Sequence, residues 1–390
     1  MRGKPDNRPL IFISAAEPSA DRHGASLIRS VLALCPSARF VGVAGPCMVA
    51  AGCDRIFDMT RHAGMLLGAM KAVPQAVAML TTSDRHLRRY PFDAAVVIDS
   101  PTLHLPLADR AHSAGIPVLY YIAPQMWAWG AYRIYKLRHR VDRLAVILPF
   151  EESYFRAQGV DATYVGHPLA EQLAQETANP KTIDEIRSRG APVVALLPGS
   201  RRHVVAEVLP GQLEVAIRVA TTFPGATFGI SVAGGTVAPI IERLVKASRL
   251  DTKSIRLFPM HRAELISAAD LVLVASGTTT LEVALHTRPM IVMYNGSRAL
   301  YQLIGRWMIQ TPHLSLPNIL AGRPIVPEFM PYYRSTTPIA DRAVELLRSE
   351  PERSAMSQEL AKVTEPLRRS RASERTAAML LELAGRKTHS

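Results

Sequence analysis

Short apolar runs of strand length recur along the first half of the chain, and amphipathic helical patterns separate them. Each run ends at or just before a loop that contains Gly, Pro, Ser or Asp. Strands that alternate with helices are typical of βαβ units, which build parallel sheets. The predicted strands of this half are 10–14, 39–45, 94–99, 117–122, 143–148 and 162–166.

A polar stretch from Glu171 to Ala191 interrupts the pattern, and we interpret it as a linker with room for one helix. Apolar runs of strand length then resume, and the tail from Thr337 onward is helical and rich in Arg and Glu. We therefore expect an α/β protein with two Rossmann-like parallel sheets and a cleft between them. The predicted strands of the second half are 192–200, 226–233, 254–258, 270–277 and 289–295.

Chain length supports this division, because 390 residues exceed the roughly 250–300 at which a single core stops growing. We expect a first domain over 1–175 and a second over 190–344, with helices in 345–390 packing back on the first. No stretch approaches the roughly 18 apolar residues of a membrane-spanning helix, and the first residues lack the apolar run of a signal peptide. These observations predict a cytoplasmic protein.

The formal net charge of +13 indicates an anionic partner. Nucleic acid is disfavoured, because Lys and Arg are scattered along the chain and aromatic residues make up only 6% of it. Phosphorylated ligands or anionic lipid are the better candidates. Cys35, Cys47 and Cys53 have no CxxC pairing, so we interpret them as buried or incidental thiols rather than as a disulfide or zinc site.

The run "VVIDSP" ends in a carboxylate, Asp99, and then in a proline. An acid at the end of a buried strand is either a turn cap or a chemical group aimed into a cleft. Ligands of open α/β sheets bind beyond the carboxyl ends of the strands, which favours the second interpretation.

Two loops of the second half resemble anion sites. In "LLPGSRR", Gly199, Ser200 and Arg201 lie between a predicted strand and a helix, where free amides and a guanidinium suit a diphosphate. An ordinary strand–helix turn is the alternative. The loop lacks the Walker lysine and is not a P-loop.

In "ASGTTTLE", Ser276, Gly277 and Thr278 open another helix, which carries Glu282. A carboxylate in this place can accept hydrogen bonds from both ribose hydroxyls. The alternative is a capping box, in which the glutamate satisfies a backbone amide. Two such loops in one domain favour a nucleotide.

The first domain offers polar loops of weaker significance. Glu17, Ser19 and Asp21 follow the first strand and suit sugar hydroxyls, although Ser and Asp are also preferred N-caps. "APQMWAWG" places Gln125 and Trp127 after another strand, and an amide with an aromatic face suits a sugar ring. Core tryptophans are the alternative there.

A loop bounded by Pro and Gly late in the second domain contains Asn318 and Arg323. A buried asparagine in such a loop usually bonds the backbone, and a substrate role is the second interpretation.

The order of "IDSP", "PQMWAW", "ILPFE", "VGHPLAE", "ALLPGSR", "ASGTTTLE" and "SLPNILAGRPIVPE" resembles the lipid-A-disaccharide synthase family, which has the GT-B architecture. The likeness runs in register from about Leu10 to Met330. It implies transfer of a diacylglucosamine from UDP to diacylglucosamine 1-phosphate, with inversion, release of UDP and no cofactor or metal.

The resemblance also implies roles for single residues. The essential aspartate of the family falls on Asp99, as a general base for the acceptor hydroxyl, and its "LLPGSR" arginine falls on Arg201, beside the departing diphosphate. Ser276, Gly277, Thr278 and Glu282 fall around UDP; Asn318, Glu17, Ser19 and Asp21 also match family positions. The apolar stretch 63–80 is expected to touch an anionic membrane on its cytoplasmic side, with a core helix as the alternative. Oligomeric state is not readable from these residues.

Departures from the family pattern cluster in the first domain. Ala20 replaces a glycine and Cys47 an arginine, and Gly130 follows Trp129 where an arginine is frequent. Thr102, Leu103 and His104 stand where Asp-Phe-Asn is common, and we expect the imidazole to take over part of the lost polar role. Donor chemistry is therefore more secure than acceptor identity. A related UDP-sugar transferase or epimerase, and a paralogue that binds UDP-sugars without turnover, are the competing functions.

Overall fold

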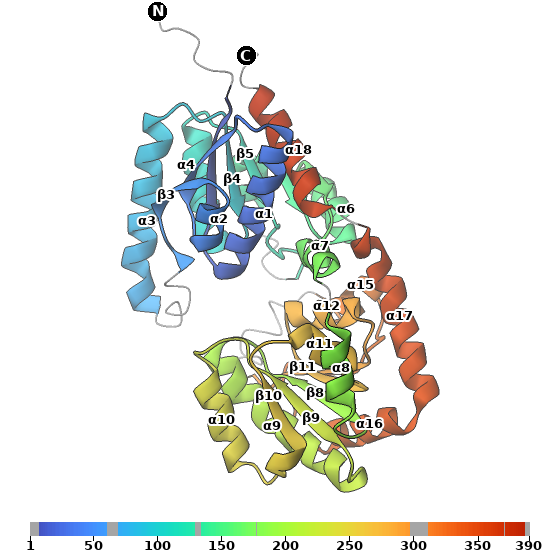
Figure 1. The fold of residues 1–390 in the computed structure, drawn as a ribbon. Coiled ribbons are helices and arrows are strands. Elements are labelled where there is room, and N and C mark those ends of the chain that lie inside the picture. The colour runs from blue at the N-terminus through green and yellow to red at the C-terminus, as the bar shows by residue number, and fades with distance from the viewer. Residues whose placement is uncertain are drawn as a thin grey trace, which may run out of the picture. The chain divides into compact units, whose positions relative to one another are not determined.

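A computed structural model of the chain divides into two compact units. The first comprises 1–171 and 369–390, and the second comprises 172–368. Figure 1 shows a parallel-stranded α/β arrangement within each unit. The residues that the structure describes are 8–60, 69–128, 134–176, 178–296, 311–369 and 371–386.

The first unit contains a seven-stranded parallel sheet with the order β3-β2-β1-β4-β5-β6-β7. Its central strands are fully buried, as expected for parallel strands that are covered on both faces. The strands are β1 (Leu10–Ala15), β2 (Arg39–Val43), β3 (Cys53–Phe57), β4 (Ala94–Ile98), β5 (Val118–Tyr121), β6 (Arg143–Val146) and β7 (Ala162–Tyr164).

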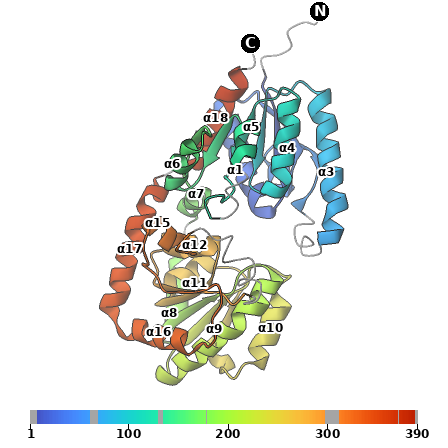
Figure 2. The same ribbon diagram turned by 180° about the vertical axis from the view of Figure 1, so that it is seen from behind.

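Helices cover both faces of this sheet, as the two opposite views of Figures 1 and 2 show. One face carries α1 (Pro18–Leu34) and the C-terminal α18 (Ala372–Arg386), which pack on each other. The other carries α3 (Ala69–Arg89), α4 (Pro101–Ser113) and α5 (Ile134–Arg140). Three shorter helices complete the unit: α2 (Pro46–Ala50), α6 (Pro149–Ala157) and α7 (Pro168–Gln175), the last of which crosses the unit boundary.

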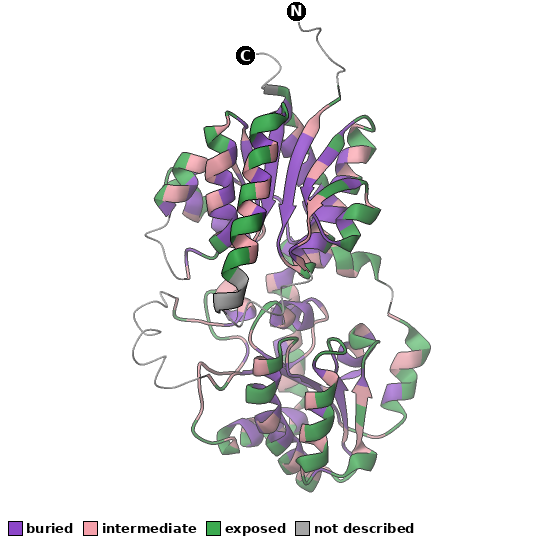
Figure 3. Cartoon of the chain, turned by 90° about the vertical axis from the view of Figure 1, so that its left-hand side faces the viewer, coloured by how far each residue is buried: buried purple, intermediate pink, exposed green. Residues whose placement is uncertain are grey.

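The second unit contains a six-stranded parallel sheet with the order β10-β9-β8-β11-β12-β13. Its strands are β8 (Val193–Leu197), β9 (Thr227–Ser231), β10 (Ile255–Phe258), β11 (Leu271–Ala275), β12 (Met290–Met293) and β13 (Glu328–Phe329). Its helices are α8 (Pro180–Arg187), α9 (Arg202–Thr222), α10 (Ala238–Ala247), α11 (Arg262–Ala268), α12 (Thr278–Leu285), α15 (Leu316–Ala321), α16 (Thr337–Arg348) and α17 (Glu350–Arg368), with a 3₁₀ turn at Thr252–Ser254. Figure 3 shows the buried strands of each unit beneath helices with exposed outer faces.

The structure differs from the sequence prediction at several places. β3 and β13 were not predicted, because the first has exposed Asp54 and Arg55 and the second is two residues long. The expected linker contains two helices, α7 and α8, rather than one. The closing helices also divide: α18 packs in the first unit, whereas α17 packs on α12 and α15 of the second.

Candidate functional site

Strand order reverses at one place in each sheet, and the candidate motifs lie at these two switch points. In the first sheet β1 and β4 are neighbours, with Ala15 paired to Ile98, and Glu17 and Asp99 follow their ends. In the second sheet β8 and β11 are neighbours, and the loops of Gly199 and Gly277 follow their ends. Open α/β sheets bind ligands at such switch points. Each unit therefore has a candidate site of its own.

The strand end at Asp99 has an unusual backbone. Asp99 (φ 56°) and Ser100 (φ 47°) are two successive non-glycine residues in the left-handed region, directly before the proline that opens α4. Such residues cost of order 1–2 kcal/mol each, and they cluster at functional sites when the surroundings hold them. Asp99 is partly exposed, and its amide is bonded to the carbonyl of Tyr121.

His104 lies beneath this turn and is fully buried. Its Nδ1 is 2.7 Å from the carbonyl oxygen of Asp99, and its Nε2 is 2.9 Å from the hydroxyl of Ser14. Burial lowers the pKa of the imidazole to about 4, so the ring is neutral. The polar role expected of His104 is therefore internal, because both ring nitrogens are bonded to groups of the protein.

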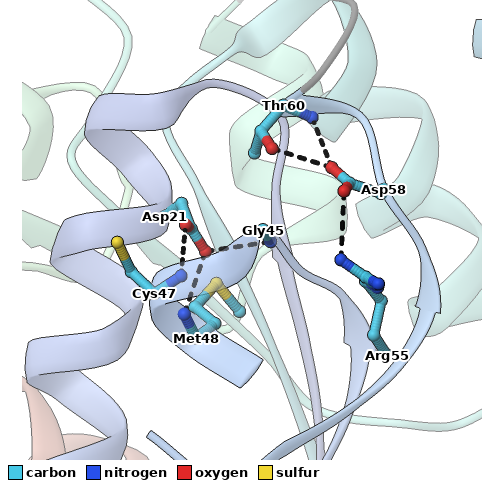
Figure 4. Close-up of polar contacts among 7 residues, drawn as sticks. All are labelled: Asp21, Gly45, Cys47, Met48, Arg55, Asp58 and Thr60. Atoms are coloured by element: carbon cyan, nitrogen blue, oxygen red, sulfur yellow. Dashed lines mark hydrogen bonds and ion pairs between the residues drawn. The ribbon is translucent and has the colours of Figure 1, made fainter. Parts of the chain in front are cut away.

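The Glu17 loop divides into open and occupied positions. Glu17 and Ser19 are partly exposed at the start of α1, whereas Asp21 is buried. Figure 4 shows the Asp21 carboxylate turned toward the amides of Gly45, Cys47 and Met48, at 2.9–3.1 Å. Asp21 therefore satisfies the amides at the start of α2 rather than contacting a sugar, and it is not the N-cap of its own helix, where Glu17 stands.

The backbone at the start of α2 packs closely against Asp21. A Cβ atom at Gly45 would lie 2.5 Å from Oδ2 of Asp21, so only glycine fits there. Figure 4 also shows Asp58, which bonds Arg55 and accepts hydrogen bonds from the amide and hydroxyl of Thr60. Ala20 lies within helix α1, where alanine is unstrained, so this departure from the family pattern leaves the backbone regular.

The loop after β5 is held by a buried glutamate. Trp127 is 7% exposed, and its indole donates to Glu151 at 2.9 Å and packs edge-on against Phe150. Glu151 also accepts from the amides of Ile147 and Leu148. Burial raises the pKa of Glu151 to about 7 despite these donors. Trp127 thus has the core position that was its alternative, and Gln125 remains exposed on the loop.

Trp129 and Gly130 lie outside the described residues, as do 63–68 of the expected membrane stretch. The cysteines Cys35, Cys47 and Cys53 are free thiols. Cys53 is buried, and burial raises its pKa to about 12, so this thiol stays protonated.

The two loops of the second switch point are open. Gly199 (φ 102°) and Gly277 (φ 137°) have backbone conformations that favour glycine. A Cβ atom at Gly199 would lie 3.8 Å from that of Ala275, the last residue of β11, so the loops are adjacent. Ser200, Arg201 and Thr278 are exposed, and Ser276 is partly exposed. Two glycine-containing loops and a guanidinium thus lie at one edge of the sheet.

Arg201 has a defined electrostatic neighbourhood. It is the N-cap residue of α9, and its charge lies near the hydroxyl of Tyr294. Burial raises the pKa of that tyrosine, Glu207 raises it further, and Arg201 opposes the rise.

A pocket of about 480 Å³ opens at the carboxyl ends of β9 and β10, within the second unit. Glu282 lines it, is 4% exposed, and accepts a 2.8 Å hydrogen bond from Nε of Arg262. Burial raises the pKa of Glu282, and Arg262 partly offsets this rise. The carboxylate therefore faces a pocket and an arginine rather than its own helix start, which disfavours the capping-box alternative.

Sequence reasoning missed most of this pocket. Its other polar and apolar walls come from Glu176, Ser231, Gly234, Phe258, Met260, His261 and Glu264. The only local signal was position, because Phe258 ends a predicted strand of the second half and Ser231 lies near the end of another. Tyr120, which bonds the carbonyl of Asp99, and Ser14, which bonds His104, were also missed.

Asn318 and Arg323 are engaged within the second unit. Asn318 is 1% exposed; its Oδ1 accepts from the amides of Ile325 and Val326, and its Nδ2 donates to the Val326 carbonyl and to Glu328. Arg323 is exposed and pairs with Glu359 of α17. Asn318 has the backbone-bonding position that its loop favoured.

Comparisons with known proteins agree along the whole chain. The sequence model of the family described as lipid-A-disaccharide synthetase matches residues 11–382. The chain is 35% identical to the lipid-A-disaccharide synthase of Nitrosococcus oceani, over 90% of this chain and 91% of that protein. It is 34% identical to that of Myxococcus xanthus, over 97% of this chain and 98% of the relative.

Solved structures show a similar fold. The UDP-GlcNAc 2-epimerase of Neisseria meningitidis, bound to UDP-GlcNAc, has a TM-score of 0.60 at 12% identity and covers 96% of this chain and 100% of its own. MurG of Acinetobacter baumannii has a TM-score of 0.55 at 14% identity, with 96% and 99% covered. At these identities the likeness concerns the fold alone, and it confirms the expected α/β class of two units with parallel sheets.

Proposed function

Because this chain belongs to the lipid-A-disaccharide synthetase family, we propose that it transfers 2,3-diacylglucosamine from UDP to 2,3-diacylglucosamine 1-phosphate, forming a β-1,6 disaccharide and UDP. The observation that carries the proposal is the placement of the family motifs at the two switch points. A carboxylate, Asp99, ends β4 at the first, and glycine loops end β8 and β11 at the second. The family match favours this reaction over another acceptor and over binding without turnover.

The donor belongs to the second unit in this proposal. A pocket of about 480 Å³ has the size of a small-ligand site and suits a nucleoside, and Glu282 within it suits the ribose hydroxyls. The backbone amides of the loops at Gly199 and Ser276–Thr278 suit the diphosphate. Arg201, exposed at the start of α9, adds a positive charge for the phosphate that becomes the leaving group.

The acceptor reacts at Asp99. Its carboxylate removes the proton of the acceptor 6-hydroxyl as that oxygen bonds to the anomeric carbon of the donor. The bond between this carbon and the diphosphate oxygen breaks, and its electron pair leaves with UDP. The configuration inverts, because attack and departure occur on opposite faces. Glu17, Ser19 and Gln125 remain available for sugar hydroxyls, since none of them is buried.

The acylated substrates place the reaction at a membrane surface. Among the described residues, no helix has the length and apolar character needed to cross a bilayer. Val73 and Val77, one turn apart on α3, are 58% and 56% exposed, and exposed Arg85 and Arg89 follow on the same helix. Apolar side chains beside arginines suit peripheral attachment to an anionic leaflet on the cytoplasmic side.

The test is an assay of the purified protein with both acylated substrates, in which UDP release and disaccharide are followed by mass spectrometry. We expect product from the wild type, and Asp99→Ala should lose roughly two to four orders of magnitude in rate, the usual effect of removing a general base. Asp54→Ala, at an exposed aspartate of edge strand β3, is the matched control and should keep its rate. UDP-sugar binding without disaccharide from the wild type would overturn the proposal.

A further inference from the structure

One backbone carbonyl at the candidate site receives two side-chain hydrogen bonds. The oxygen of Asp99 lies 2.7 Å from the hydroxyl of Tyr120 and 2.7 Å from Nδ1 of His104. Tyr120 and His104 are both fully buried. Both lone pairs of this oxygen are therefore used, at a residue whose backbone is in the left-handed region.

The protonation state of His104 follows from its partners. A carbonyl oxygen only accepts hydrogen bonds, so Nδ1 carries the proton. The ring is neutral, because burial lowers its pKa to about 4, and Nε2 therefore accepts. The hydroxyl of Ser14, 2.9 Å away, is then the donor to Nε2 and fixes this tautomer.

Ser14, Tyr120 and His104 come from elements that are neighbours in the fold. Ser14 of β1 and Tyr120 of β5 both pair with Val97 of β4, so their side chains point to the same face of the sheet. Helix α4 covers that face and supplies His104 from its first turns. Strand β5 and helix α4 thus supply the two donors to the carbonyl of Asp99, and strand β1 holds one of these donors, His104, through Ser14.

We propose that His104 is a positioning residue for Asp99, an inference that rests on the function proposed above. Its Nδ1–H, together with the Tyr120 hydroxyl, holds the left-handed backbone from which the Asp99 carboxylate projects. His104 does not touch substrate, because it is fully buried. It stands where the family commonly has asparagine, whose side-chain amide nitrogen occupies nearly the same place as Nδ1 of histidine.

This correspondence supplies a matched pair of variants. Asparagine at 104 keeps a donor at the Nδ1 position, whereas glutamine places its donor near the Nε2 position, toward Ser14. We expect His104→Gln to lower kcat by about 10- to 100-fold, the usual effect of a misplaced catalytic group, with KM for both substrates nearly unchanged. His104→Asn should restore most of kcat. His112→Gln, at an exposed histidine of the same helix, is the control.

A role in folding alone predicts a different result, namely that both variants lose stability and activity together. Thermal unfolding and UDP binding, which concerns the second unit, therefore accompany the kinetics. If His104→Gln does not fold, Tyr120→Phe removes the other donor to the same carbonyl, and we expect a smaller loss of kcat with unchanged KM. In an Asp99→Ala background, neither substitution should lower the residual rate further.

Crystal structures of the two variants give a readout that does not depend on activity. We expect φ of Asp99 to stay near 56° in His104→Asn and to leave the left-handed region in His104→Gln. Wild-type turnover in His104→Gln, or an unchanged Asp99 backbone in its structure, would overturn the inference alone. A wild type that forms no disaccharide would overturn the proposed function, and the structures would still decide the positioning role.

Discussion

The strand end at Asp99 and the strand ends at Gly199 and Gly277 reverse the chain by different means. All three residues have positive φ, but the second unit uses glycine, and the first uses an aspartate held by Tyr120 and His104. Glycine adopts this backbone without strain and leaves the amides open. Under the proposed function, this difference follows from what each site presents to its substrate: a side chain in one unit and backbone donors in the other.

A side chain at a left-handed position requires support, because the local backbone energy opposes it. Two hydrogen bonds to one carbonyl are worth about 1–3 kcal/mol together, which is comparable with the strain of one such residue. Both donors are buried, so water cannot compete for them. Under the proposed function, the buried polar residues beneath Asp99 therefore support the site without contacting substrate.

The largest effect is expected when Asp99→Gly is compared with Asp99→Ala, which separates the role of the side chain from that of the backbone. Both variants should lose roughly two to four orders of magnitude in rate, because both lack the carboxylate. Glycine also relieves the left-handed strain, so Asp99→Gly should unfold with about 1 kcal/mol more stability than Asp99→Ala. Chemical denaturation and the disaccharide assay measure the two effects. Equal stabilities would mean that Asp99 is not strained.

Much of the fold was predictable because its strands are continuous apolar runs. Eleven strands of the sheets overlap runs predicted from the sequence; the two missed strands are short or carry exposed charges. The positions of Asp99 and Gly199 at strand ends followed directly. Packing of α17 and α18 on different units was not predictable, because both are amphipathic helices and the sequence does not state which surface each covers.

The candidate site was less predictable, because polar residues in loops bond ligands and backbone equally well. Asp21, Trp127 and Asn318 were sugar or substrate candidates, and each makes hydrogen bonds inside its own unit. The pocket near Glu282 has walls from several strand ends with no common motif. The left-handed backbone of Asp99 left no trace in the residue types, since Asp and Ser suit many turns.

The loop after β5, also in the first unit, is likewise held by a buried polar side chain. Glu151 holds Trp127, and burial raises its pKa to about 7, above its ordinary value of 4.5. The folded state therefore keeps a proton that the unfolded state releases. The resulting contribution to the free energy of unfolding is on the order of 3 kcal/mol. It is fully present below about pH 4.5 and is lost as the pH rises through about 7.

Glu151→Gln removes this titration while keeping a side chain of the same shape. We expect the wild type to lose stability relative to Glu151→Gln between about pH 5 and pH 8, as measured by urea unfolding at several pH values. Glu152→Gln, at the neighbouring partly exposed glutamate, is the control. A constant difference between wild type and Glu151→Gln would show that the carboxylate is ionised throughout.

The glycine strand ends are expected to respond to alanine through the backbone. The backbone of Gly277 (φ 137°, ψ −165°) lies in a region that is almost exclusive to glycine. Gly277→Ala should therefore lower the free energy of unfolding by about 1–3 kcal/mol. This loss comes from the backbone alone, because no described atom lies within 4 Å of the added carbon. Gly199→Ala adds a 3.0 Å approach to Val204. Calorimetry should find UDP affinity lowered about 5- to 100-fold in both. Unchanged affinity would place the diphosphate elsewhere.

The smallest effect is expected at Arg323, whose basic side chain and loop suggested a substrate contact. Its guanidinium pairs with Glu359 on the exposed surface of the second unit, where solvent screens the pair. Arg323→Ala and Glu359→Ala should therefore behave alike, with kcat and UDP-sugar KM within about twofold of the wild type.

A phosphate contact of Arg323 predicts a difference between the two variants instead. Only Arg323→Ala would raise the KM, because Glu359→Ala leaves the arginine in place and frees it for the ligand. Steady-state kinetics of the two variants at low and high salt distinguish these outcomes, since a phosphate contact also weakens with ionic strength. The role of an arginine in a family motif is thus decided by substituting its ion-pair partner as well as the arginine itself.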